Sequence, residues 1–113
     1  MRHASLDFNE PFKVLFELRQ VQAAVMCVAA GDKEGGPDNR HRGADQWLYV
    51  VAGQGVALVG GIEKPLAPGD LLVIEQGEKH EIRNKSGEPL QLLTWYHPPA
   101  YTANGEPLPA GEK

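Results

Sequence analysis

The chain alternates between short apolar runs and turn-forming residues. The clearest run covers residues 12–19, where Phe12, Val14, Phe16 and Leu18 fall on one side of an extended chain and charged residues on the other. A period of two is typical of a strand with one buried face. Further strands are predicted over residues 21–30, 46–52, 56–59, 62–66, 71–74, 80–84 and 89–97. In the last of these, neither alternating set is clearly polar, so the pattern leaves open which set enters the core.

Turn signals separate these runs. Residues 31–43 are polar and glycine-rich and are predicted to form a loop, while Gly60-Gly61 predicts a two-residue hairpin turn. About nine short strands spaced by turns indicate an all-β sandwich or barrel. We expect an N-terminal arm over residues 1–11, a barrel over 12–97 and a proline-rich tail over 98–113, anchored by Tyr101 and Leu108 if it docks.

Size and composition limit the class of protein. The 113 residues fit one domain, and the single cysteine, Cys27, excludes an intrachain disulfide. The formal net charge of −4 is spread along the chain, which argues against a nucleic-acid partner or a membrane surface. No apolar stretch has the length of a signal peptide or a membrane helix. We therefore expect a cytoplasmic protein.

Two polar clusters carry the candidate chemistry. The first runs from Asn39 through His41 and Gln46 to Gly53, and the second contains Gly69, Glu75, Gly77, His80 and Asn84. Together they resemble the two motifs of the cupin superfamily. In the first motif, Asn39 stands at a position that is usually histidine, and Gln46 at one that is usually glutamate. In the second, Glu75 stands at a position that is usually proline.

The resemblance implies a jelly-roll β-barrel with one divalent metal ion near its open end. Carried over position by position, the metal ligands are Asn39, His41, Gln46 and His80, and no catalytic residue is assigned. The ion could be Fe, Mn, Ni, Cu or Zn, since imidazole suits these metals. Two of the four positions are neutral amides, so we expect weaker metal binding than in a site with a carboxylate, and a stronger pull on an anionic ligand.

Alternatives remain at several of these positions. Asn39 also fits an ordinary turn, and Gln46 also fits a barrel-lining amide without a ligand role. A one-residue register slip would place the carboxylate of Asp45 in the site instead of Gln46. Asn84 is expected to be structural, in the turn that follows its strand. Arg40, Arg42 and Arg83 could surround the mouth of the pocket, but a solvated side chain on a strand face is the favoured interpretation for each. Met26 and Trp95 could line the pocket, and apolar packing in the core explains them equally well.

The sequence supports more than one function. A metal-dependent enzyme, dioxygenase-like or an isomerase or lyase, would act on a small anionic or oxygen-rich molecule. The alternatives are a non-catalytic binding or sensor protein with a degraded metal site, and an accessory subunit. We also expect a homodimer, because the strand over residues 12–18 would otherwise leave an apolar edge exposed.

Overall fold

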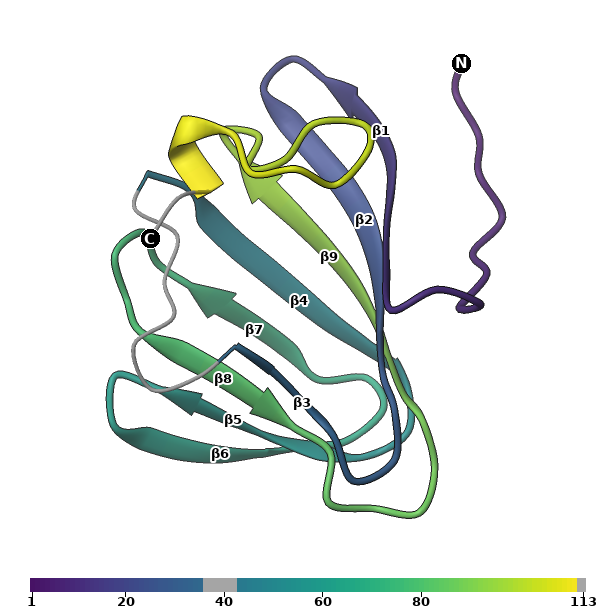
Figure 1. Ribbon diagram of the computed structural model, residues 1–113, viewed down its shortest axis with the longest axis vertical. Coiled ribbons are helices and arrows are strands. Elements are labelled where there is room, and N and C mark those ends of the chain that lie inside the picture. The colour runs from purple at the N-terminus through teal and green to yellow at the C-terminus, as the bar shows by residue number, and fades with distance from the viewer. Residues whose placement is uncertain (36–42, 112–113) are drawn as a thin grey trace.

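Two antiparallel sheets face each other in the computed structural model, which describes residues 1–35 and 43–111 (Figure 1). The five-stranded sheet has the order β1-β2-β9-β4-β7, and the four-stranded sheet the order β3-β8-β5-β6. Their strands are β1 (Phe12–Leu18), β2 (Val21–Val28), β3 (Lys33–Gly35), β4 (Asp45–Ala52), β5 (Gly55–Val59), β6 (Ile62–Leu66), β7 (Leu71–Ile74), β8 (His80–Arg83) and β9 (Leu90–His97). A short 3-10 helix, η1 (Pro109–Gly111), ends the described chain. The all-β barrel predicted from the sequence is confirmed.

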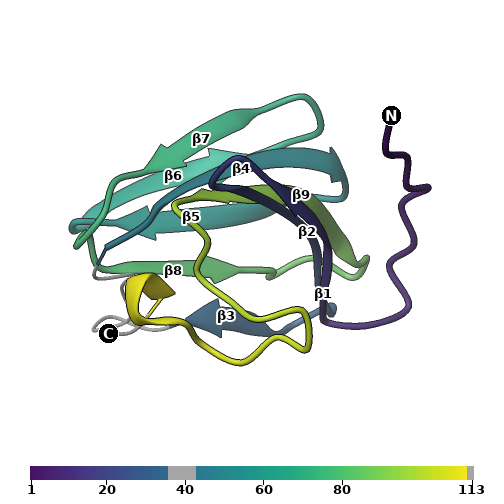
Figure 2. The same ribbon diagram turned by 90° about the horizontal axis from the view of Figure 1, so that it is seen from above.

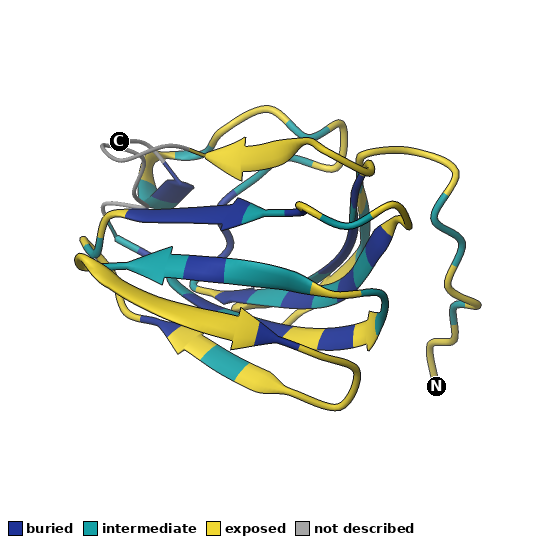
Figure 3. Ribbon diagram, turned by 90° about the horizontal axis from the view of Figure 1, so that it is seen from below, coloured by how far each residue is buried: buried dark blue, intermediate teal, exposed yellow. Residues whose placement is uncertain are grey.

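The core lies between the two sheets. Its members include Met26, Leu48, Val50 and Leu92 from the five-stranded sheet and Ile82 from the four-stranded one, all at most 5% exposed. Alternation along β9 buries Leu90, Leu92, Thr94 and Tyr96 and turns the other set outward. The question left open by the sequence is thereby settled. Figure 3 shows the same contrast between elements, with β8 buried and β3 and β6 largely exposed.

Two-residue turns join two of the hairpins. Gly60 and Gly61 have φ values of +55° and +81°, as the predicted hairpin turn requires. The β1–β2 turn uses Arg19 and Gln20 at φ values of +48° and +70°, although neither is glycine. The pairing of Leu18 with Val21 confirms that only these two residues form the loop.

Two local predictions were wrong. Residues 33–35, predicted as loop, form the edge strand β3, which pairs with β8. In β1 the pairing register shifts between Val14 and Phe16, so the strand contains a bulge at Leu15. A bulge reverses the alternation beyond it. Phe16 and Leu18 are therefore 37% and 46% exposed and do not share the buried face of Phe12.

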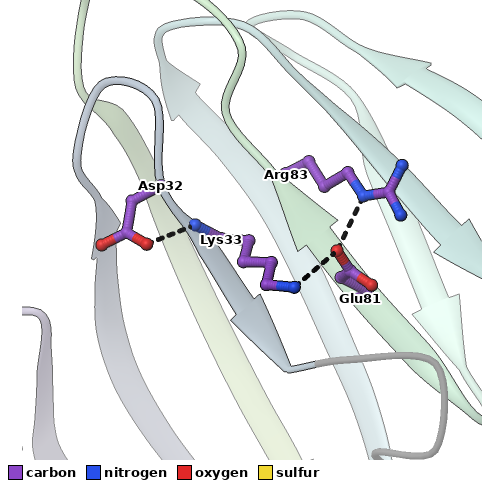
Figure 4. Close-up of polar contacts among 4 residues, drawn as sticks. All are labelled: Asp32, Lys33, Glu81 and Arg83. Carbon is purple, nitrogen blue, oxygen red and sulfur yellow. Dashed lines mark hydrogen bonds and ion pairs between the residues drawn. The ribbon is translucent and has the colours of Figure 1, made fainter.

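An ion-pair cluster joins β3 to β8 (Figure 4). The Glu81 side chain is 1% exposed, and its Oε1 lies 2.7 Å from Arg83 Nε and 3.9 Å from Lys33 Nζ. The hydrogen bond from Arg83 is the main cause that lowers the pKa of Glu81. Arg83 thus pairs with Glu81, and it is not among the described residues that line the cavity of the candidate site.

The segment after β9 folds back over one end of the two sheets (Figures 1 and 2). Ala100 is fully buried, and a Cβ built on Gly111 would lie 2.1 Å from the Ala100 carbonyl oxygen, so only glycine fits there. Gly43 N donates to Ala110 O at 3.1 Å, which ties the segment to the start of β4. None of the described residues belongs to a helix long and apolar enough to cross a membrane.

Candidate metal and ligand site

A cavity of about 240 Å³ lies between the sheets, at the end covered by the C-terminal segment. Gln46 and Tyr96 line it from the five-stranded sheet, and His80 and Glu34 from the four-stranded sheet. The full set of described lining residues is Phe12, Met26, Glu34, Gln46, His80, Ile82, Tyr96, Tyr101 and Gly105. Both sheets and the C-terminal segment therefore build one cavity.

Hydrogen bonds fix the orientation of the Gln46 amide. The Thr94 hydroxyl donates to the Trp47 carbonyl oxygen at 2.8 Å, so Thr94 Oγ1 can only accept from Gln46. Gln46 Nε2 accordingly donates to Thr94 Oγ1 at 3.1 Å and to the Tyr96 hydroxyl at 3.2 Å. Gln46 is 2% exposed, and its buried Oε1 has no hydrogen-bond partner among the residues that the structure describes. A buried acceptor without a partner is costly unless a ligand satisfies it.

His80 reaches the cavity from the first residue of β8, after the turn that contains Gly77. Its Nδ1 lies 3.1 Å from the Glu78 carbonyl oxygen. A carbonyl only accepts, so Nδ1 carries the proton in the neutral ring and Nε2 keeps the lone pair. Burial lowers the pKa of His80, which favours this neutral form. A neutral imidazole with its lone pair on Nε2 is the form that binds metal ions.

Two tyrosines form the polar wall beside Gln46. The Tyr96 and Tyr101 rings meet edge to face with their centroids 5.2 Å apart. Burial is the main cause that raises the pKa of Tyr96 well above its usual value. Burial, followed by the negative charge of Glu34, raises the pKa of Tyr101 to about 12. Both phenols are therefore neutral hydrogen-bonding groups at physiological pH.

The predicted metal ligands fall into two groups. Gln46 and His80 line the same cavity from opposite sheets. Asn39 and His41 lie outside the described residues, as do Arg40 and Arg42. The register of β4 is regular from Asp45 to Val50. The Asp45 carboxylate accepts a hydrogen bond of 2.8 Å from Gln76 N, and Asp45 is not among the residues that line the cavity. The structure thus gives the pocket Gln46 and not the alternative, Asp45.

The described donor set fits part of a metal site. Gln46 Oε1 is a buried oxygen without a hydrogen-bond partner in the described part of the chain, and His80 Nε2 carries a lone pair in the neutral ring. Within residues 1–35 and 43–111, no three side chains among His, Cys, Asp and Glu are grouped closely enough to hold an ion. A complete site therefore needs the amide of Gln46 and further donors beyond those ranges.

Several lining residues were not predicted. Glu34 falls in the segment expected to be a loop, where no sequence signal marks it. Tyr96 belongs to the inward set of β9 with Leu90, Leu92 and Thr94, which is one of the two alternating sets between which the sequence pattern did not choose. Met26, for which the sequence left pocket lining and core packing open, lines the cavity and also belongs to the core. Trp95 does not, because it lies on the outer face of the sheet and stacks on Trp47 with centroids 5.8 Å apart.

Asn84 has a structural role, as predicted. Its Nδ2 donates to the carbonyl oxygens of Val28 at 2.9 Å and Glu88 at 2.7 Å. Its Oδ1 accepts from Ser86 N at 3.0 Å and from Ser86 Oγ at 2.7 Å. These bonds hold the turn before β9 and leave the amide no capacity for a ligand.

Comparisons with known proteins place this architecture in a family. Residues 24–96 match the sequence profile described as the cupin domain. The oxalate-binding protein of Thermotoga maritima is 31% identical over 55 residues, which cover 49% of this chain and 46% of that protein. This chain thus spans less than half of the length of that relative.

Solved structures of other proteins share this fold. A predicted oxalate decarboxylase from Thermotoga maritima superposes with a TM-score of 0.65 and 26% identity, covering 71% of this chain and 69% of that one. A Cupin 2 conserved barrel domain protein from Salinispora arenicola superposes with a TM-score of 0.70 and 18% identity, covering 86% and 88%. The profile match spans well over half of the sequence, and the chain belongs to the cupin domain family.

Proposed function

We propose that this protein binds a small oxygen-rich anion through a divalent metal ion held in the cavity between the sheets. His80 Nε2 and Gln46 Oε1 would hold the ion, together with Asn39 and His41. The observation that carries the proposal is the buried Gln46 Oε1. Within residues 1–35 and 43–111 this oxygen has no hydrogen-bond partner, while the amide nitrogen is held by two hydrogen bonds. When bound, a divalent ion of the Fe, Mn, Ni, Cu or Zn type would supply positive charge that polarises ligand oxygens.

The charge of the cavity explains why an anion should need the metal. None of the described lining residues supplies a positive charge at neutral pH, because burial favours the neutral form of His80. An anion that leaves water for a buried cavity needs a positive charge or hydrogen bonds to stabilise it there. A divalent ion would supply that positive charge. The oxalate in the name of the Thermotoga maritima relative is an anion of the size and chemistry that such a site would accept.

A catalytic role, dioxygenase-like or as an isomerase or lyase, is the stronger form of this proposal. It requires a group that moves a proton next to the ligand. Glu34 is the lining carboxylate within the described ranges, and the phenols of Tyr96 and Tyr101 are the other proton-bearing groups on the wall. The alternative is a binding or sensor protein that uses the same cavity without turnover.

We also propose a cytoplasmic location for this protein. The single cysteine of the chain is unpaired, which is consistent with a reducing compartment.

Calorimetric titration of the chelator-treated protein with Mn²⁺ tests the proposal. We expect one ion per chain, and loss of binding in His80→Ala. Gln46→Glu should bind Mn²⁺ roughly tenfold more tightly, about 1.4 kcal/mol, because a carboxylate replaces a neutral carbonyl oxygen. Oxalate should then bind to the metal-loaded protein and not to the metal-free protein.

Gln91→Glu is the matched control, since it adds the same charge on the outward set of β9. It should leave Mn²⁺ affinity unchanged. Unaltered Mn²⁺ binding in His80→Ala, or no gain in Mn²⁺ affinity in Gln46→Glu, would contradict a metal site in this cavity. The remaining interpretation would be a protein that binds its ligand without a metal.

We also propose a homodimer, but through a sheet face and not through the edge of β1. The outer sheet face comprises Trp47, Tyr49, Leu71, Val73, Leu93 and Trp95, which neighbour one another in the pairing of β9, β4 and β7. None of the six is charged, and aromatic residues of this kind are enriched at interface cores. We therefore assign this face to a second copy of this chain.

A further inference from the structure

The C-terminal segment builds one wall of the cavity and does not merely cover it. Tyr101 and Gly105 both line the cavity, and Tyr101 packs against Phe12 with ring centroids 4.9 Å apart. The segment is closed on itself by a bridge between Tyr101 and Pro107 and by a bond of 2.7 Å from Leu108 N to Ala100 O. Its geometry is therefore held by many contacts along its length.

Buried Gln22 fixes the position of Tyr101. The Gln22 side chain is 1% exposed, although it lies on β2, far from the segment in sequence. Its Nε2 donates to the Tyr101 carbonyl oxygen at 2.5 Å, and its Oε1 accepts from Tyr101 N at 3.1 Å and Ala100 N at 3.3 Å. One amide thus satisfies both backbone groups of Tyr101, as a neighbouring strand would. Such a clamp fixes the backbone from which the phenol projects.

The surroundings of the Tyr101 phenol place it at the cavity. It lies against the Tyr96 ring and within the field of the Glu34 carboxylate, and both of those residues also line the cavity. A neutral phenol donates one hydrogen bond and accepts others, so it suits a carboxylate or hydroxyl oxygen. His80 approaches the cavity from the four-stranded sheet.

The geometry points to Tyr101, positioned by Gln22, as a ligand-contacting residue that selects small molecules with an oxygen acceptor within reach of its hydroxyl group. This inference rests on the proposed function only in that the cavity binds a ligand. Oxalate, malonate and glycolate are suitable probes because each has oxygens at both ends. With a volume of about 240 Å³, the cavity has room for roughly eight water-sized groups of about 30 Å³.

The test is calorimetric titration of these three acids into the Mn²⁺-loaded protein and its variants. Tyr101→Phe should bind Mn²⁺ as the wild type does, but should bind the preferred acid about tenfold or more weakly, since a hydrogen bond to a charged oxygen is lost. Gln22→Met should show the same pattern, as a positioning residue would. Tyr49→Phe, on the outer sheet face, is the matched control and should change neither affinity.

The outcomes separate the two proposals. Unchanged acid affinity in Tyr101→Phe, with thermal unfolding like that of the wild type, would overturn the role of Tyr101 and leave the metal site standing. If acid binding depends on Tyr101 but needs no metal, the ligand-contacting role of Tyr101 is supported and the proposed metal site is overturned. If the wild type binds none of the three acids, with or without Mn²⁺, both proposals are overturned.

Discussion

Single side chains decide what the cavity can bind. The Gln46 amide is the central example. The Thr94 hydroxyl group has one proton, and it donates that proton to the Trp47 carbonyl oxygen. The amide nitrogen must then face Thr94 and Tyr96, and the oxygen must face elsewhere. A glutamate at this position would carry a charge that two hydroxyl groups on one side cannot by themselves balance in a buried site. The neutral amide thus suits a barrel that is stable with or without a metal.

Tyr101 also gives a prediction in alkaline solution. Its folded-state pKa of about 12 exceeds the usual value of 10.0. Above the usual value the unfolded chain loses this proton while the folded chain keeps it, so folding stability is full below pH 10 and falls as the pH rises toward 12. Tyr101→Phe should therefore lose less stability over that range than the wild type, measured by urea unfolding at a series of pH values. Parallel losses in both proteins would contradict the buried, neutral phenol.

At the residue scale, half of the site could be predicted. The motif spacing identified Gln46 and His80, and both line one cavity. Glu34 could not be predicted, because Lys33-Glu34-Gly35 has no periodicity and becomes a strand only through pairing with β8. Nor could Gln22 and Tyr101 be linked, since their contact joins residues 79 positions apart.

At the scale of elements, the strands were predicted better than their registers. All eight predicted strands appear within two residues of the expected bounds, and the largest deviation is in the strand over residues 21–30, which ends at Val28. The bulge at Leu15 was not predicted, because the apolar alternation from Phe12 to Leu18 is unbroken in the sequence. Only pairing with β2 shows that Phe16 and Leu18 point away from the core. Alternation predicts a strand, but its partner determines which face is buried.

The β1–β2 turn gives a prediction about stability. Arg19 and Gln20 occupy the left-handed region, which costs a non-glycine residue about 1–2 kcal/mol. Replacing the pair by Asn-Gly, the preferred sequence for this turn, should raise the free energy of unfolding by about 1 kcal/mol after the entropic cost of glycine. Both side chains are exposed, so no packing is lost. Denaturant unfolding measures the change.

The hairpin at Gly60-Gly61 supplies the matched control. Alanine at both positions forces two side chains into the same left-handed geometry and should lower the unfolding free energy. A loss of stability in the Asn-Gly variant of the β1–β2 turn would show that Arg19 and Gln20 are not strained.

At the scale of the whole molecule, the two faces of the five-stranded sheet differ in burial. The inner side carries the core and the cavity, while the outer sheet face presents Leu71 at 57% exposure, Tyr49 at 39% and Val73 at 38%. A face of this kind on an isolated chain would favour association. The site and the proposed interface are thus on opposite sides of the same strands.

Sedimentation velocity at micromolar concentration tests the proposed dimer. We expect the wild type to sediment as a dimer and Leu71→Glu as a monomer, because a charge placed within an apolar interface is left unpaired. Ile62→Glu is the control, since Ile62 is 72% exposed but lies on β6 of the other sheet. It should remain dimeric. A wild type that sediments as a monodisperse monomer would rule out the interface.

The account depends most on the claim that the cavity binds a divalent ion through Gln46 and His80. The most direct measurement is the anomalous diffraction of crystals grown with Mn²⁺. We predict one peak per chain, within bonding distance of His80 Nε2 and Gln46 Oε1. A metal-free cavity in those crystals, or a peak bound only to surface carboxylates, would contradict the claim and leave Gln46 as a wall of a metal-free ligand pocket.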